Sequence, residues 1–126
     1  YDNITEFERR VADSGTSIVK VMLHISKDEQ QERLAERLDR PDKHWKYNPG
    51  DIDERMLWAE YERAYELAIQ RTDADHAPWF IVPADRKWYA RLAVQTLLLS
   101  ALRDLDPQWP TADFDVELEK QRLADS

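Results

Sequence analysis

The sequence predicts an α/β fold in which parallel strands are flanked by helices. Two short apolar runs, residues 18–25 and 79–82, are rich in branched or aromatic residues and lie between turn formers, which is typical of strands buried on both faces. Helical patterns lie before, between and after these runs. The order strand, helix, helix, strand, helix is that of a parallel α/β layer.

The first helix is expected over residues 3–11. Asn3 and Glu6 have the spacing of a capping box, in which each side chain bonds the backbone N–H of the other residue. Gly15 follows as a turn residue before the first strand. Apolar residues recur on one face of this helix, at Ile4, Phe7 and Val11.

A second helix is expected from Ser26 to about Asp39. Ser26 and Glu29 repeat the capping-box spacing, and Pro41 prevents the helix from continuing. After an irregular stretch, residues 40–51, a long helix is expected from Asp51 to about Arg71. Its apolar stripe comprises Leu57, Tyr61, Ala64 and Ala68.

The second strand leads into a last helix over residues 86–105, which Asp85 is expected to cap. Apolar residues cover so much of its circumference that we expect it to be largely buried. Residues after Pro107 are expected to form a surface extension. The apolar residues of the helix are Trp88, Leu92, Val94, Leu97, Leu98, Leu99, Ala101 and Leu102.

Composition excludes several classes of protein. The 126 residues make one domain at most and include 26 acidic and 18 basic residues, the opposite of the balance expected for a nucleic-acid binder. There is no cysteine, which excludes a disulfide scaffold and fits a reducing compartment such as the cytoplasm. No apolar run is long enough to span a membrane, so neither a membrane nor a nucleic acid is an expected partner.

The two predicted strands cannot bury each other, because a parallel sheet needs a neighbour on each side of a buried strand. The sequence supplies enough helices but too few strands, and it begins with Tyr1 instead of Met. We therefore expect a fragment whose layer is completed by a partner chain or a missing segment.

Positive charge gathers in residues 33–46, the basic segment. It holds five basic and three acidic residues, whereas the remainder of the chain holds 13 basic and 23 acidic residues. Its arginines recur at i, i+4 and i+7, so they form one stripe on the second helix, and two lysines follow. Guanidinium groups match phosphate oxygens bidentately and lysines add point charge, so this segment is a candidate phosphate site. Its members are Arg33, Arg37, Arg40, Lys43 and Lys46.

A second interpretation of the basic segment stays open. Glu29 with Arg33, and Glu36 with Arg40, are i, i+4 pairs in the favourable order, so the stripe is also compatible with an ordinary solvated helix face.

The aromatic residues and histidines are each compatible with a purely structural role or with a functional one. Trp45 and Tyr47 lie among cations and are suited to stacking on a base or clamping a lid, but packing onto the domain beneath is the favoured interpretation. His24, on a strand predicted to be buried, is expected to be a hydrogen-bonded core residue. The three histidines lack metal-ligand spacing, so no metal site is expected.

Glycine is scarce. A loop that cradles phosphates needs glycines before a lysine, so that backbone N–H groups can approach the phosphate. Gly15 and Gly50 are isolated and no Gly-Lys-Ser/Thr sequence occurs. This chain alone is therefore not expected to hold a nucleoside triphosphate in the usual P-loop way.

A succession of motifs resembles the C-terminal half of the polyphosphate kinase 2 family, from Tyr1 to about Pro110. The motifs are residues 23–30 (LHISKDEQ), 33–37 (RLAER), 41–46 (PDKHWK), 51–58 (DIDERMLW) with Tyr61, 77–85 (APWFIVPAD) and 87–89 (KWY). Several motifs in order are far more specific than any one of them.

The resemblance implies a partial three-layer fold of the P-loop-kinase, thymidylate-kinase-like type whose N-terminal half is missing, together with the Walker A loop and the second phosphate-binding motif. It also implies phosphoryl transfer between inorganic polyphosphate and nucleotides with Mg²⁺, whose ligands lie outside this segment. Residues 1–110 then belong to the family domain, residues of about 27–60 form its lid module, and residues 111–126 form a tail.

By the same resemblance, Arg33 and Arg37 match catalytic arginines of the lid helix, and Arg37 is the better candidate to touch the transferred phosphoryl group. The resemblance also implies lid residues that bind phosphate, Arg40, Lys43 and Lys46, and residues near the nucleotide, Pro83, Ala84 and Asp85.

The expected function is therefore part of a polyphosphate:nucleotide phosphotransferase that acts on nucleoside mono- or diphosphates. The segment alone is expected to be inactive, and the whole enzyme to be a homo-oligomer. Two alternatives stay open: a non-catalytic module that binds polyphosphate or nucleotide, and a fragment that serves only oligomer contacts.

Overall fold

The computed structural model describes residues 1–126 and confirms the α/β fold class. None of its helices combines the length and the apolar character needed to cross a membrane. The elements follow in the order α1 (Asp2–Asp13), β1 (Lys20–His24), α2 (Lys27–Asp39), the 3₁₀ helix η1 (Pro41–Lys46), α3 (Gly50–Met56), α4 (Trp58–Thr72), β2 (Trp79–Pro83), α5 (Lys87–Leu105) and α6 (Val116–Ala124).

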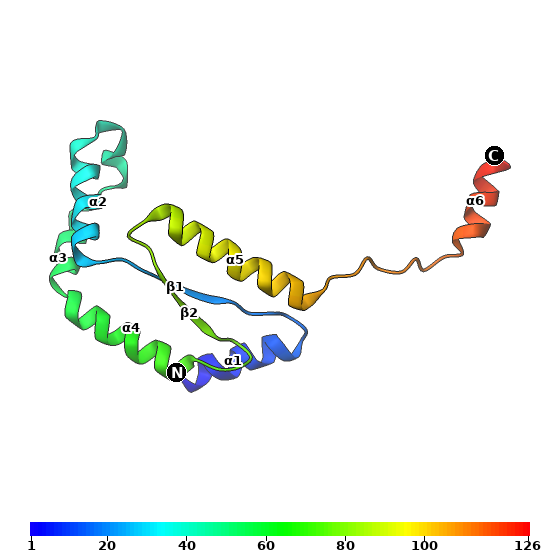
Figure 1. The fold of residues 1–126 in the computed structure, drawn as a ribbon, viewed down its shortest axis with the longest axis horizontal. Helices are drawn as coiled ribbons and strands as arrows, with labels where there is room; N and C mark the ends of the chain where they lie inside the picture. The colour runs from blue at the N-terminus through cyan, green and yellow to red at the C-terminus, as the bar shows by residue number, and fades with distance from the viewer.

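The two strands pair in parallel at the centre of the molecule. Their register runs from Lys20 opposite Trp79 to His24 opposite Pro83. Figure 1 shows α5 on one side of the strand pair and α1 with α4 on the other. It also shows α2 and η1 projecting from the end at which β1 stops. This is the carboxyl end of both strands, where α/β proteins bind their ligands.

The core of the chain is small. Six of the 126 residues are buried, and Val82, Ala84 and Ala90 form the one core cluster, between β2 and α5. Partly buried residues from β1 and α5, among them Val21 and Leu97, pack against it. The sheet is therefore anchored mainly through one face of β2.

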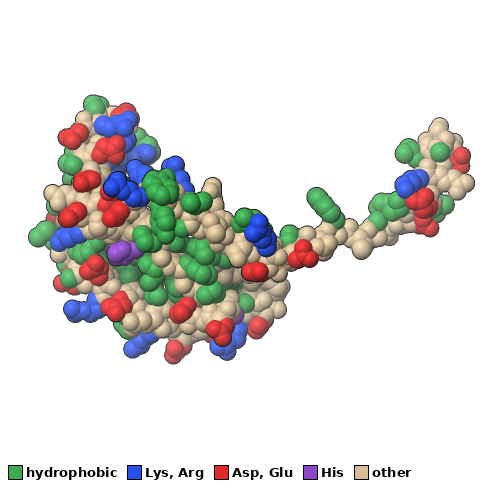
Figure 2. Space-filling model, in the orientation of Figure 1, with side chains coloured by type: hydrophobic (Ala, Val, Ile, Leu, Met, Phe, Trp, Pro, Cys, Tyr) green, Lys and Arg blue, Asp and Glu red, His purple; other side chains and the backbone are tan.

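The predicted deep burial of both strands and of the last helix is wrong for this chain. Ala90 is the only buried residue of α5, while Leu92 and Leu102 are 54% and 56% exposed. On the strands, Leu23 and Ile81 are 53% and 60% exposed. Figure 2 shows hydrophobic side chains gathered over the middle of the body. A sheet of two strands has no neighbour to cover these residues, as the prediction of an incomplete layer requires.

Helix starts agree with the sequence in one place and differ in another. The Ser26 Oγ accepts a hydrogen bond from the Glu29 backbone N–H at 3.1 Å, so the predicted cap of α2 is confirmed. The predicted cap at Asn3 is wrong, because α1 already begins at Asp2 and Tyr1 occupies its N-cap position without a side-chain bond.

Other details of the elements differ from the predictions. The helix expected over residues 51–71 is divided at Leu57 into α3 and α4, and the irregular stretch contains η1. Asp85 does not cap α5; its carboxylate instead accepts a hydrogen bond from the Ser26 backbone N–H at 2.7 Å. The residues after Pro107 form the expected surface extension, which is exposed almost throughout and ends in α6, apart from the body in Figure 1.

The cap of α2 gives a stability prediction. Ser26→Ala removes the only side-chain acceptor for the Glu29 N–H, so the free energy of unfolding should fall by about 1 kcal/mol. Chemical denaturation measures this change. Ser17→Ala is the matched control, because Ser17 is exposed and its side chain makes no hydrogen bond within the chain. An equal loss in both variants would contradict the cap.

Candidate functional site

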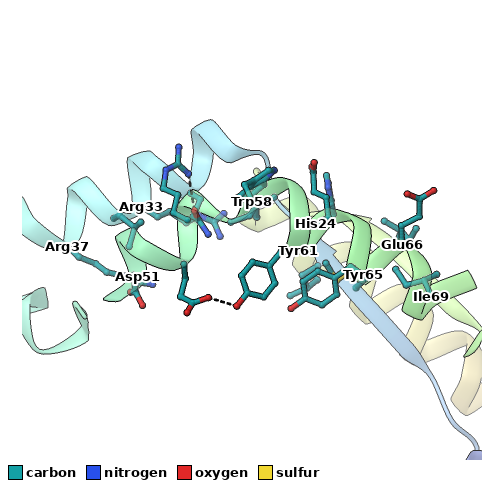
Figure 3. Close-up of a pocket in the computed structure, with 18 of the residues that line it drawn as sticks. His24, Arg33, Arg37, Asp51, Trp58, Tyr61, Tyr65, Glu66 and Ile69 are labelled. Atoms are coloured by element: carbon teal, nitrogen blue, oxygen red, sulfur yellow. Dashed lines mark hydrogen bonds and ion pairs between the residues drawn. The ribbon is translucent and has the colours of Figure 1, made fainter. Parts of the chain in front are cut away.

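A hollow of about 850 Å³ lies between β1, α2, α3 and α4 (Figure 3). Residues 22–25, at the end of β1 and just beyond it, line one side, and the buried side chain of Leu34 lies in the α2 wall. Arginines come from α2, carboxylates from α3 and aromatic rings from α4. The residues that give the hollow its chemistry are His24, Arg33, Arg37, Asp51, Glu54, Arg55, Trp58, Tyr61 and Tyr65.

The aromatic wall follows from helical spacing. Trp58, Tyr61 and Tyr65 recur at i, i+3 and i+7, so their rings lie on one face of α4 and line the hollow. The sequence prediction named Tyr61 but placed it in a stripe with smaller apolar residues, and it missed the other two rings. The i, i+3, i+7 repeat of aromatic residues was the signal that could have found them.

Arg33 lines the hollow but is held firmly within the chain. Its Nε donates to the Glu29 Oε1 at 2.7 Å, which confirms the predicted i, i+4 pair. Its Nη2 donates to the backbone oxygen of Ala84, also at 2.7 Å. Arg33 therefore links α2 to the turn after β2.

Arg37 is the less constrained arginine of the hollow. Its Nη1 lies 3.5 Å from the Asp51 Oδ2, a long contact at the limit of a hydrogen bond. Its side chain is 36% exposed, and it is drawn beside Asp51 in Figure 3. The guanidinium consequently has donors available for a ligand.

Arg40 and Lys43 lie outside the hollow and are paired with carboxylates. Arg40 contacts Asp42 at 2.8 Å and Glu36 at 3.4 Å, and Lys43 also contacts Glu36. The hydrogen bond from Lys43 lowers the pKa of Glu36, and the hydrogen bond from Arg40 lowers the pKa of Asp42. Both carboxyl groups therefore stay ionised at neutral pH and compete with any phosphate for these cations.

Lys46 has no carboxylate partner, and its ammonium group lies 4.8 Å from the centre of the Trp45 ring. Trp45 is 78% exposed, and its indole N–H donates to the Asp42 backbone oxygen at 3.1 Å. The favoured prediction that Trp45 packs onto the domain beneath is therefore wrong. Figure 1 shows that η1 stands away from the strand pair.

A second hollow of about 390 Å³ lies at the carboxyl ends of the strands. Of the residues expected near a nucleotide, Pro83 and Asp85 line it, whereas Ala84 is buried beneath. His24 also lines it and is exposed, so the expectation of a core histidine is wrong. The backbone N–H of Ser26 lowers the pKa of Asp85, whose carboxylate is thus ionised.

The structure brings the predicted residues together in two places. Arg33 and Arg37 share the larger hollow, while the residues after β2 lie in the smaller one. No three His, Asp or Glu side chains lie close enough together to hold a metal ion. The side chains of this chain therefore offer no preformed set of three ligands for magnesium.

Comparison with known proteins identifies similar sequences. The family model of polyphosphate kinase 2 matches residues 1–110. An AMP/ADP-polyphosphate phosphotransferase from Meiothermus ruber is 50% identical over 110 residues, which are 87% of this chain and 41% of that protein. An ADP-polyphosphate phosphotransferase from Rhodopseudomonas palustris is 40% identical over 87% of this chain and 38% of its own length. This chain therefore spans about two fifths of these relatives.

Solved structures agree with the sequence comparison. The crystal structure of polyphosphate kinase 2 from Arthrobacter aurescens TC1 matches all of this chain with 55% identity and a TM-score of 0.92, over 45% of its own chain. A structure from Pseudomonas aeruginosa, described as a putative polyphosphate kinase 2, matches 87% of this chain with 32% identity and a TM-score of 0.80, over 24% of its own chain. The chain thus reproduces a part of both folds.

One acid–base prediction follows from the aromatic wall. The Tyr61 hydroxyl donates to the Glu54 carboxylate, and this bond raises the pKa of Tyr61 above its ordinary value, because ionisation would place two negative charges together. Glu54→Gln should bring the pKa down, as measured by NMR titration of labelled tyrosine rings. Glu62→Gln is the control, since Glu62 lines the hollow without bonding Tyr61. An unchanged pKa in Glu54→Gln would rule out the bond.

Proposed function

Because the chain belongs to the polyphosphate kinase 2 family, we propose that it is the lid-bearing part of an enzyme that transfers phosphoryl groups between inorganic polyphosphate and nucleoside mono- or diphosphates. The relatives named as AMP/ADP- and ADP-polyphosphate phosphotransferases support this substrate class. In this proposal residues 1–110 belong to the catalytic domain, residues of about 27–60 are its lid and residues 111–126 are a tail. The enzyme is a cytoplasmic homo-oligomer.

The observation that carries the proposal is the position of Arg37. It combines a weak internal contact with a place in the wall of the larger hollow, at the carboxyl end of the sheet. Phosphoryl transfer needs little covalent help from a protein, and mainly requires positioning and neutralisation of the charge on phosphate oxygens. We assign the contact with the transferred phosphoryl group to Arg37, and Arg33 lines the same hollow one turn before it.

Three further cations serve the proposed lid in different ways. Lys46 forms no ion pair with a carboxylate, so its ammonium group can bind a phosphate without first breaking such a pair. Arg40 and Lys43 must first exchange Glu36 or Asp42 for phosphate oxygens. A polyanion with many phosphates makes this exchange favourable, because each cation that it engages adds a charge-assisted bond. Lid closure then excludes water from the reacting groups.

Magnesium and the nucleotide are the two remaining groups that the proposed reaction needs. Magnesium, which the family resemblance implies, would be held by other groups, so every step proposed here uses side chains of this chain alone. The smaller hollow, with Pro83 and Asp85 in its wall and Ala84 beneath, is proposed to lie near the nucleotide. Its position outside the carboxyl ends of the strands supports that placement.

A non-catalytic role is the competing function. The internal ion pairs of Arg33, Arg40 and Lys43 favour it, because they are what a solvated helix face contains. Under that hypothesis the chain contributes polyphosphate binding or oligomer contacts without touching the reacting atoms. The variant described next separates the two functions.

Arg37→Ala in the full-length enzyme should lower the turnover number by about 100-fold or more, the scale of losing one donor to a transition state. Arg37→Lys should fall between, because it keeps the charge but loses the guanidinium fork. Formation of ADP or ATP from polyphosphate is the measurement. Arg9→Ala is the control, since Arg9 contacts only Glu6 on α1. Full activity of Arg37→Ala would remove Arg37 from the site and favour the non-catalytic role.

Glu36→Gln should strengthen polyphosphate binding by about two- to fivefold at low salt, because it frees Lys43 and one contact of Arg40. The affinity should also fall more steeply with salt concentration, since more cations then meet phosphate. Titration with polyphosphate at several salt concentrations measures both effects. Glu32→Gln on the same helix is the control, as Glu32 forms no ion pair. An unchanged affinity would exclude Arg40 and Lys43 from phosphate binding.

A further inference from the structure

The parallel ladder between β1 and β2 stops one rung early. Its first rung joins the Lys20 N–H to the Pro78 oxygen, and its last backbone rung joins the Ala84 N–H to the His24 oxygen at 2.7 Å. Bonds of a parallel ladder repeat every two residues along each strand. If the same pattern continued past the bond between Ala84 and His24, the Ser26 N–H would bond the Ala84 oxygen.

Two side chains replace this rung. The Ser26 N–H donates to the Asp85 Oδ1 at 2.7 Å, and the Ala84 oxygen accepts from the Arg33 Nη2 at 2.7 Å. Both backbone groups that the ladder leaves unpaired therefore gain charged partners, which form stronger hydrogen bonds than a neutral amide does. The strands can separate at this point without leaving a polar group unsatisfied.

The substituted rung lies at the base of the proposed lid. Ser26 is the N-cap of α2, and Arg33 lies two turns further along the same helix. Within the lid, Arg55 of α3 donates to the Lys27 backbone oxygen at 2.7 Å and so joins α3 to α2. Apart from the Tyr61–Glu54 bond, the contacts of Arg33 and Asp85 are the side-chain hydrogen bonds that join residues 26–56 to the rest of the chain.

We propose that Asp85 and Arg33 are positioning residues, which together form the last rung of the sheet and fix the direction in which α2 leaves it. The rung holds Arg37, one turn beyond Arg33, at the wall of the hollow. Its catalytic consequence rests on the proposed function, but the hydrogen bonds themselves do not. Asp85 thus acts through the lid helix, beyond its predicted place near the nucleotide.

The direct test is amide hydrogen exchange at residue 26 in the full-length protein without substrates. Exchange should be slow in the wild type, faster in Asp85→Asn, whose oxygen is a neutral acceptor, and fastest in Asp85→Ala. Asp75→Ala is the control, because Asp75 lies exposed in the turn before β2, at the opposite end of the strands. Slow exchange in both Asp85 variants would overturn the rung, whether or not the protein transfers phosphate.

The kinetic test separates positioning from direct contact. Asp85→Ala should lower kcat by about tenfold or more and leave KM for polyphosphate within about twofold, because a displaced lid misplaces Arg37 without removing any phosphate ligand. Asp85→Asn should restore most of kcat. Wild-type kcat in Asp85→Ala, with exchange at residue 26 accelerated, would overturn the positioning role.

A double-mutant cycle then tests whether the two side chains act as one unit. If Arg33 acts through the rung, Arg33→Ala should cost little further kcat in the Asp85→Ala background. If its loss multiplies with that of Asp85→Ala, Arg33 contacts phosphate independently and the shared role is overturned. An enzyme with rapid residue-26 exchange in Asp85→Ala but no phosphoryl transfer in the wild type would refute the proposed function and leave the rung intact.

Discussion

The pairing of β1 with β2 is the interaction on which the rest of the structure depends. These two short strands carry the only core cluster, because Val82 and Ala84 of the β2 segment pack against Ala90 of α5. The same pairing brings the ends of the strands together, so that Ser26 meets Asp85 and Arg33 meets Ala84. The direction of α2, and with it the placement of the arginine stripe, is therefore set by a ladder of five residue pairs.

Electrostatics divides the basic segment into groups that its spacing does not distinguish. Arg40 and Lys43 form ion pairs with Glu36 and Asp42, so these four side chains together carry no net charge. Arg33 donates a hydrogen bond to the Ala84 backbone oxygen at the end of the sheet. Arg37 and Lys46 are the members least balanced by carboxylates, so the proposed function assigns the first contacts with phosphate to them. A chain of net charge −8 can thus still present a local surface suited to a polyanion.

Local signals in the sequence predicted local structure well. The Ser26–Glu29 cap, both strands and the parallel layer are confirmed, since each depends on neighbouring residues or on a strong apolar run. The predicted cap at Asn3 is a local signal that failed, but most of the other failed predictions depend on distant contacts. No sequence pattern indicates that Asp85 turns back to Ser26, and none indicates that Trp45 stays exposed. Burial of α5 failed because periodicity marks an apolar face without showing what covers it.

The open edges of the sheet have a practical consequence. A two-stranded sheet leaves one row of N–H and C=O groups unpaired on each strand, and here Leu23 and Ile81 stand exposed beside them. Bare strand edges flanked by apolar side chains are templates for intermolecular pairing and aggregation. Expressed by itself, this polypeptide should therefore tend to self-associate through these edges.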